Sequence, residues 1–143
     1  MKKVLVTTRL LKSNEERISK LWNAKLNLNN KIYSKNQLIE LSKDCDGILS
    51  SILDKIDAKT INMLSNKVRI ISNFAVGFGN IDTEAARKRN IVVTNTPDVL
   101  TDATAEIAML LILGTCRRAA EGIKWARNKN WKWSADFLIG KQL

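Results

Sequence analysis

The strongest fold signal in this 143-residue chain is the stretch FAVGFGNIDTEAARKRNIVVTNTPDVLTDATAE, residues 74–106. It begins where an apolar, β-branched run ends, and its Asp82 precedes helix-permissive residues, as an N-cap does. A second β-branched run, Ile91–Asn95, comes next, and Pro97 separates it from a new helical pattern. A strand, a helix and a strand in this order predict two parallel strands joined by a crossover helix.

The same alternation extends back to the N-terminus and predicts an α/β fold with helices flanking a parallel sheet. Because right-handed crossovers restrict the topology, five such units indicate a flavodoxin-like strand order, 2-1-3-4-5. Strands are expected at Lys3–Thr7, Leu26–Asn29, Gly47–Ile52, Val68–Phe74 and Ile91–Asn95.

Helix signals lie between these runs. A helix over Glu15–Ala24 would place Ile18, Leu21 and Trp22 on one face, which we expect to pack on the sheet. Ser34 and Gln37 have the spacing of a capping box ahead of Leu38 and Leu41. Asp57, like Asp82, has the position of an N-cap at the start of a crossover helix.

The pattern changes after Pro97. One long helix is predicted from Thr101 to the region of Lys129, Asn130 and Trp131, and its first half is apolar nearly all round. Such a helix needs partners on several faces. The segment Arg117–Trp133 mixes basic residues with tryptophans, which could bind nucleic acid or an anionic membrane, or anchor the helix to a partner subunit.

Charge, cysteine spacing and the length of the apolar run argue against several classes of function. The formal charge of +10 suggests an anionic partner, but the basic residues are spread along the chain, so no specific nucleic-acid role is predicted. Cys45 and Cys116 are far apart and predict neither a zinc cluster nor a disulfide framework, which fits the cytoplasm. The apolar run Ile107–Leu113 is too short to span a bilayer, so no membrane association is expected.

Two positions allow a structural and a functional interpretation. Gly77 and Gly79 either permit a tight turn after a strand or let backbone amides approach a ligand, and a carboxylate would suit such amides. Thr104 is either a residue of the first helical turn or a cofactor contact.

Residues 74–106 closely resemble the D-isomer-specific 2-hydroxyacid dehydrogenases, glyoxylate/hydroxypyruvate reductases in particular. The resemblance implies that 1–98 is part of a substrate domain and that 99–143 is an arm leading to a nucleotide-binding domain, with a homodimer formed through 101–133. It further implies that the amides of Val76 and Gly77 hold a substrate carboxylate, that Leu53 lines the same pocket and that Thr104 faces the cofactor. In that family the C-terminal end of the chain returns to complete the substrate domain.

The Gly-rich fingerprint and the catalytic Arg, Glu and His residues of this family are not found in the chain. It contains no histidine, and Gly77 and Gly79 do not complete G-x-G-x-x-G because Asp82 stands at the last position. We therefore expect a truncated member with no catalytic residues, inactive alone, whose complete enzyme reduces small 2-keto acids with NAD or NADP, neither of which this chain binds by itself. The alternatives are a non-catalytic oligomerisation or small-carboxylate-sensing module and, third, a basic polyanion-binding protein.

Overall fold

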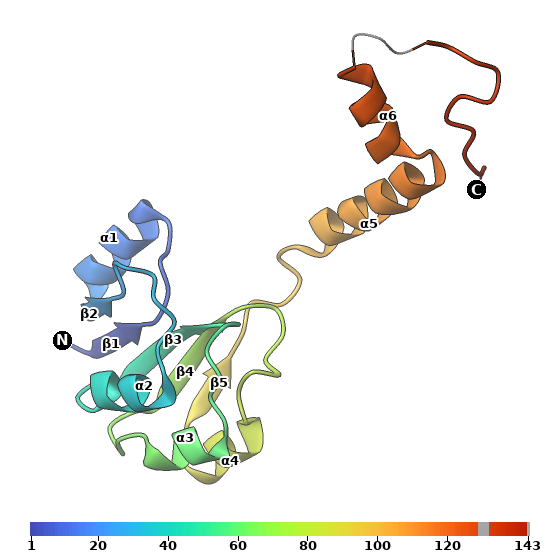
Figure 1. Ribbon diagram of the computed structural model, residues 1–143. Helices are drawn as coiled ribbons and strands as arrows, with labels where there is room; N and C mark the ends of the chain where they lie inside the picture. The colour runs from blue at the N-terminus through green and yellow to red at the C-terminus, as the bar shows by residue number, and fades with distance from the viewer. Residues whose placement is uncertain (129–131, 143) are drawn as a thin grey trace. The chain divides into compact units, whose positions relative to one another are not determined.

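A computed structural model describes residues 1–128 and 132–142 of the chain and divides it into two compact units, Met1–Val99 and Leu100–Leu143. The residues Lys129, Asn130 and Trp131, which the sequence places at the end of the long helix, lie outside the described part. Unit 1 contains, in chain order, β1 (Lys3–Val6), α1 (Lys12–Leu21), β2 (Asn23–Leu26), α2 (Lys35–Ser42), β3 (Gly47–Ser51), α3 (Ala58–Met63), β4 (Ile70–Phe74), α4 (Thr83–Lys88) and β5 (Val92–Thr94). Unit 2 contains α5 (Thr101–Cys116) and α6 (Ala119–Ala126) (Figure 1).

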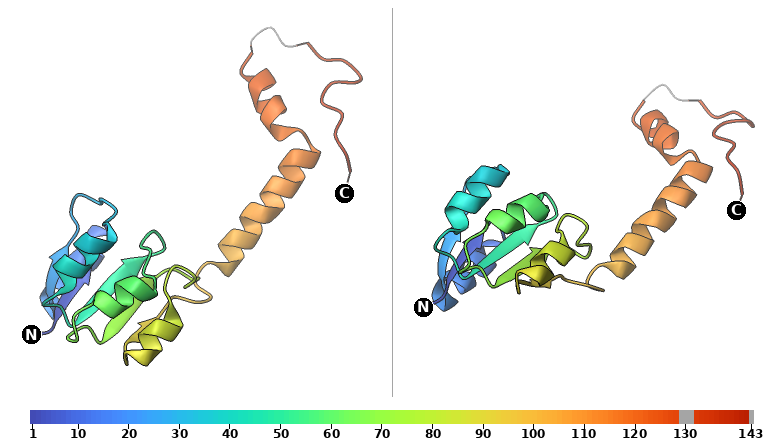
Figure 2. Two further views of the ribbon diagram at one scale, coloured as in Figure 1. Left: turned by 60° about the horizontal axis from the view of Figure 1, so that its bottom comes forward. Right: turned by 90° about the horizontal axis from the view of Figure 1, so that it is seen from below.

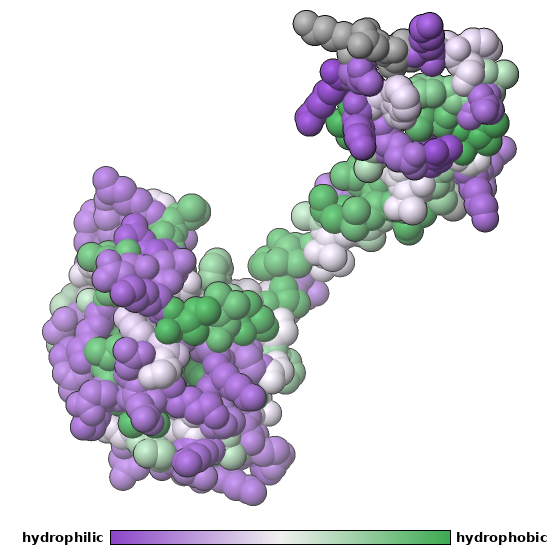
Figure 3. All heavy atoms as spheres, viewed as in Figure 1, coloured by the Kyte–Doolittle hydropathy of each residue, from purple (hydrophilic) through white to green (hydrophobic). Residues whose placement is uncertain are grey.

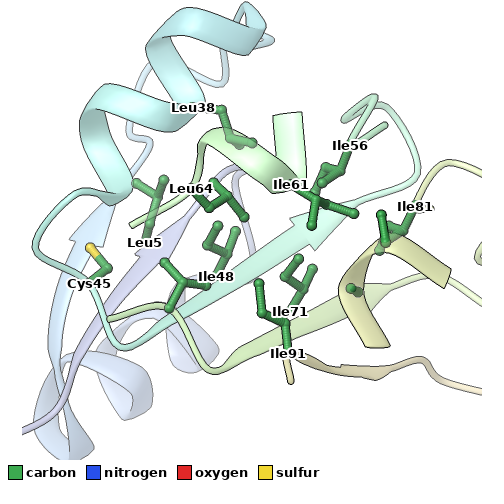
Figure 4. Packing of buried hydrophobic residues seen from close by; sticks show 13 residues of the cluster. Leu5, Leu38, Cys45, Ile48, Ile56, Ile61, Leu64, Ile71, Ile81 and Ile91 are labelled. Atoms are coloured by element: carbon green, nitrogen blue, oxygen red, sulfur yellow. The ribbon is translucent and has the colours of Figure 1, made fainter. Parts of the chain in front are cut away.

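Unit 1 has the predicted α/β architecture. Its five strands are all parallel and lie in the order β2-β1-β3-β4-β5, which confirms the expected topology. Helices α2, α3 and α4 lie side by side on one face of the sheet (Figure 2). The core fills the space between that face and these helices (Figure 4), and its fully buried side chains include Leu5, Ile48, Ile56, Ile61 and Ile71.

The predicted helix caps are confirmed. Ser34 accepts a hydrogen bond from the Gln37 amide while the Gln37 side chain accepts one from the Ser34 amide, which completes the capping box of α2. Asp57 caps α3 and Asp82 caps α4 through the backbone amides three residues on. Leu38 is buried in the core and Leu41 packs against it, as the spacing predicts.

The first helix and the second strand begin earlier than predicted. Helix α1 starts at Lys12 because the carboxylate of Glu15 accepts a hydrogen bond from the Leu10 amide (3.1 Å) and forms an ion pair with Arg9 (3.0 Å), which fixes the chain before the helix. Strand β2 ends at Leu26, and the predicted strand Leu26–Asn29 is wrong. The buried side chain of Asn27 donates to the carbonyls of Thr7 and Lys31 and so turns the chain at that point.

The expected packing of the α1 face is also wrong. The buried residue of α1 is Glu15. Of the three residues predicted to face the sheet, Ile18 is half-buried, whereas Leu21 and Trp22 are 53% and 40% exposed. Helix α1 contacts β2, at one edge of the sheet, and covers only part of the sheet face on its side. Ile70 and Val92 are therefore exposed.

The single long helix predicted after Thr101 is two helices. Arg118 adopts a left-handed conformation, with φ of 54°, and separates α5 from α6. The C-terminal tail fixes this break, because the Lys141 amide donates to the Cys116 carbonyl (2.8 Å) and Arg118 donates to the Ile139 carbonyl. Helix α5 is apolar nearly all round, as predicted, and its side chains are exposed in unit 2 (Figure 3).

Among the described residues, no helix combines the length and apolarity needed to cross a bilayer. The described residues likewise hold no cluster of His, Cys, Asp or Glu that suits a metal ion.

Candidate functional site

The candidate site lies where β3 and β4 end, at the carboxyl edge of the parallel sheet. Two loops meet there: the β3 loop, residues 52–57, and the β4 loop, residues 75–80. A parallel bridge between Ile56 and Ile81 joins them, with hydrogen bonds from the Ile56 amide to the Asn80 carbonyl (2.9 Å) and from the Asp82 amide to the Ile56 carbonyl (3.0 Å). Ligands of open α/β sheets bind at this edge, so the topology itself favours a site here.

A buried polar network supports the β4 loop. Asn73, which is 1% exposed, accepts a hydrogen bond from the Ser50 hydroxyl and donates to the Asn80 side chain (3.0 Å) and to the Gly77 carbonyl (2.9 Å). Asn80 donates in turn to the carbonyls of Ser51 and Asp54, at 3.0 Å each. Asn80 thus joins the β4 loop to the β3 loop, and every buried side-chain nitrogen and oxygen atom in the described part of the chain has a partner.

Asp54, a residue of the β3 loop whose side chain is nearly fully buried, anchors this loop. One carboxylate oxygen accepts hydrogen bonds from the Thr7 hydroxyl (2.5 Å), the Ser51 amide (2.8 Å) and the Ser51 hydroxyl (3.2 Å). Leu53, one residue earlier, is 62% exposed. The loop therefore presents Leu53 outward from an anchored base.

The predicted contact residues lie on these two loops. Leu53 lines a groove of about 490 Å³ together with Gly79 and Asn80. Val76 and Gly77 occupy the exposed part of the β4 loop, and their backbone amides donate no hydrogen bond to any described residue. Neither residue is among those that line the groove with Leu53. Exposed amides without a protein acceptor suit an anionic oxygen atom, since they can donate without displacing a protein partner.

The glycines of the β4 loop are not required by its backbone conformation. Neither Gly77 nor Gly79 has a positive φ, and a Cβ atom added at either position would meet nothing within 4 Å. A tight turn that only glycine can adopt is therefore excluded as the explanation. The absent side chains leave the amides accessible, which favours the ligand interpretation.

Several carboxylates line the groove, and each already has hydrogen-bond donors. Hydrogen bonds from Lys35 and from the backbone and hydroxyl of Thr60 hold the pKa of Asp57 well below its usual range. Burial first, and the negative charge of Asp54 second, raise the pKa of the Tyr33 hydroxyl. Among the described residues, no arginine lines this groove, and the cationic side chain that does is the exposed Lys55.

Thr104 lies in the first turn of α5, in unit 2, and is exposed. Its hydroxyl donates to the Leu100 carbonyl (2.8 Å), the bond of an ordinary helical threonine. Among the described residues, the loop between a strand and a helix that contains two glycines is the β4 loop, and it does not complete G-x-G-x-x-G.

Sequence reasoning missed Asn73, Asn80 and Asn95, which hold the β4 loop. Asn95 donates to the Val76 carbonyl at 2.7 Å. Asparagine is unfavourable within a strand, so Asn73 inside an otherwise β-branched run was the available signal.

The catalytic domain of the D-isomer-specific 2-hydroxyacid dehydrogenases matches residues 4–135 of this chain. The chain belongs to this family. A glyoxylate reductase of Korarchaeum cryptofilum is 42% identical over 109 residues, which are 75% of this chain and 32% of the relative. A glycerate dehydrogenase of Hyphomicrobium methylovorum is 39% identical over 109 residues, 76% of this chain and 34% of the relative. The chain thus spans about a third of the length of these D-2-hydroxyacid dehydrogenases.

Solved structures agree with this assignment. A protein from Polaromonas assigned to the NAD-binding D-isomer-specific 2-hydroxyacid dehydrogenases superposes with a TM-score of 0.85 at 30% identity, covering 98% of this chain and 44% of that one. An NADPH-dependent glyoxylate/hydroxypyruvate reductase from Sinorhizobium meliloti, in complex with NADP and malonate, gives 0.73 at 28% identity, covering 91% and 39%. The predicted resemblance to D-2-hydroxyacid dehydrogenases is confirmed, and relatives with both NAD and NADP are represented.

Proposed function

We propose that this chain supplies the substrate-domain part of an NAD(P)-dependent D-2-hydroxyacid dehydrogenase that reduces small 2-keto acids such as glyoxylate. In this proposal residues 1–98 form the partial substrate domain and residues 99–143 form the arm. The observation that carries the proposal is the β4 loop, whose exposed Val76 and Gly77 amides have no acceptor among the described residues and whose Gly79 and Asn80 line the groove with Leu53. Relatives named as glyoxylate reductases, and one solved with the dicarboxylate malonate, support a small carboxylate as the ligand.

In this proposal each residue of the candidate site has a separate role in binding the substrate. The amides of Val76 and Gly77 would hold the carboxylate, and the Leu53 side chain would cover one side of the substrate. Backbone donors that are already oriented lose little freedom when the ligand binds. The nicotinamide group supplies a hydride when it is bound. The proton for the keto oxygen needs a donor such as histidine, which this chain does not contain.

The exposed part of the sheet fits a larger assembly. In the enzymes that this chain resembles, the C-terminal end of the chain returns to complete the substrate domain. The groove of about 390 Å³ lined by Trp22, Leu49 and Ile70, on the face that α1 covers only in part, is where we propose that segment packs. Thr104 would contact a cofactor only when another domain or chain holds it.

The arm supports association with a second copy. Helix α5 exposes large apolar side chains, among them Leu110 (63%) and Leu111 (64%), and Trp125 of α6 packs edge-on against Phe137 of the C-terminal tail. Apolar exposure on this scale is typical of interaction surfaces. We propose a homodimer formed through residues 101–133, in the cytoplasm, where the two free cysteines stay reduced.

The test combines activity with binding. The purified 143-residue chain is mixed with glyoxylate and NADH or NADPH, and cofactor absorbance is followed; no turnover is expected. In parallel, ¹⁵N-labelled protein is titrated with glyoxylate and with neutral acetamide as a control. Shifts of the Val76 and Gly77 amide signals with glyoxylate alone support the proposal. Robust turnover, or equal shifts with acetamide, contradicts it.

A second candidate function is a non-catalytic oligomerisation or carboxylate-sensing module, which the exposed apolar face of α5 favours. It predicts a discrete oligomer that glyoxylate stabilises thermally. Light scattering together with a thermal shift measurement tests it. A polydisperse mass without ligand stabilisation argues against this function.

A further inference from the structure

Three consecutive carbonyls of the β4 loop are held by hydrogen bonds from residues outside it. The donors are one backbone amide and two side-chain amides. The pairs are Thr96 N to Ala75 O (2.9 Å), Asn95 Nδ2 to Val76 O (2.7 Å) and Asn73 Nδ2 to Gly77 O (2.9 Å).

Holding a carbonyl also fixes the next amide. The peptide group is planar, and in the trans form the C=O of one residue and the N–H of the next point in opposite directions. The described chain contains no cis peptide bond. The three held carbonyls therefore set the directions of the N–H groups of Val76, Gly77 and Phe78. None of these three N–H groups donates to a described residue.

We propose that Asn95 and Asn73 are positioning residues, which orient the amides of Val76, Gly77 and Phe78 as donors for the substrate carboxylate. This inference rests on the proposed function and adds two residues and a third donor, Phe78, to it. An asparagine suits the role because its side-chain amide donates to a carbonyl without bringing a charge to the loop. An unheld loop would have to order itself on binding, which weakens affinity.

The two asparagines differ in what else they support. Asn73 is buried and belongs to the network that includes Ser50 and Asn80, so its replacement disturbs the fold as well as the loop. Asn95 is half-buried, and its side chain donates to the Val76 carbonyl outside that network. A change at Asn95 therefore isolates the positioning effect.

The experiment compares Asn95→Leu with the unaltered chain. Leucine keeps the approximate size of asparagine and removes the donor. Asn62→Leu, on the exposed side of α3, is the matched control. For each protein, the dissociation constant for glyoxylate is obtained by ¹⁵N titration, and the ¹⁵N heteronuclear NOE of residues 76–78 is measured without ligand. The dispersion of the remaining amide signals reports whether unit 1 is folded.

Asn95→Leu is expected to weaken glyoxylate binding about tenfold and to lower the NOE of the loop, since hydrogen bonds to a charged group depend on oriented donors. Asn62→Leu should change neither, and Asn95→Gln, which keeps an amide donor, should restore part of the affinity. If Asn95→Leu binds within about twofold of the unaltered chain, the inference is overturned and the proposed function stands. If the unaltered chain itself shows no shift at residues 76–78, both are overturned.

Discussion

Asn73→Ala should remove a large share of the stability of unit 1. The Asn73 side chain makes three short hydrogen bonds in a buried position, to the Gly77 carbonyl (2.9 Å), the Asn80 side chain (3.0 Å) and the Ser50 hydroxyl (2.9 Å). Each buried hydrogen bond contributes about 1 kcal/mol net, so their loss costs about 3 kcal/mol. Unpaired partners and the small cavity add to this figure. A domain of this size is stable by roughly 5–15 kcal/mol, so the effect is readily measured.

The assay is urea unfolding followed through the amide NMR signals of Ile48 and Ile71. Both residues lie in central strands of unit 1, so their signals report on this unit separately from α5 and α6. With a denaturant slope of about 2 kcal/mol/M, the unfolding midpoint should fall by about 1.5 M. Asn62→Ala, at an exposed position of α3, is the control and should stay within about 0.5 kcal/mol. A loss below about 1 kcal/mol for Asn73→Ala would refute the claim that this network holds the two loops together.

Three further predictions concern packing, pH and association. Gly47→Ala should destabilise unit 1 by about 1–3 kcal/mol, because the new Cβ would lie 2.8 Å from Ile70 Cγ2, whereas Gly77→Ala, with open space around it, should be nearly neutral in urea unfolding. The lowered pKa of Asp57 means that its contribution to stability is present above its ordinary pKa of 3.8 and is lost as the pH falls through the folded-state value. Asp57→Asn should thus lower the melting temperature at neutral pH and flatten its decline in acid; an unchanged pH profile contradicts this. Leu110→Lys, on the exposed apolar helix α5, should reduce the mass measured by light scattering, and an unaltered oligomer would place the interface elsewhere.

Local sequence signals predicted those parts of the fold whose conformation is set by residues close together in the sequence. Asp57, Asp82 and the Ser34–Gln37 pair cap their helices through amides three residues away, so their roles depend on neighbours in sequence. The alternation of β-branched runs and helical patterns also sufficed for the strand order, because right-handed crossovers leave few topologies.

Errors arose where distant residues set the conformation. Strand β2 ends at Leu26 because the Asn27 side chain donates to the carbonyl of Thr7, which follows the neighbouring strand β1. Helix α5 ends at Cys116 because Lys141 donates to its carbonyl, and no proline or glycine marks that break in the sequence. In both cases a side chain or tail from elsewhere in the chain competes with the local pattern.

The sequence by itself determined the α/β class and the strand order, through the alternation of β-branched runs and helical patterns along the chain. It also indicated the family, through the resemblance of residues 74–106. It also located Leu53, Val76 and Gly77 as candidate contacts, through resemblance. Only the tertiary structure decided how the β4 loop is held, since Asn73 lies in β4 whereas Asn95 follows β5, and both meet the loop where these neighbouring strands end. Hydrogen bonds between residues that the chain separates depend on the packed sheet, and no local pattern encodes them.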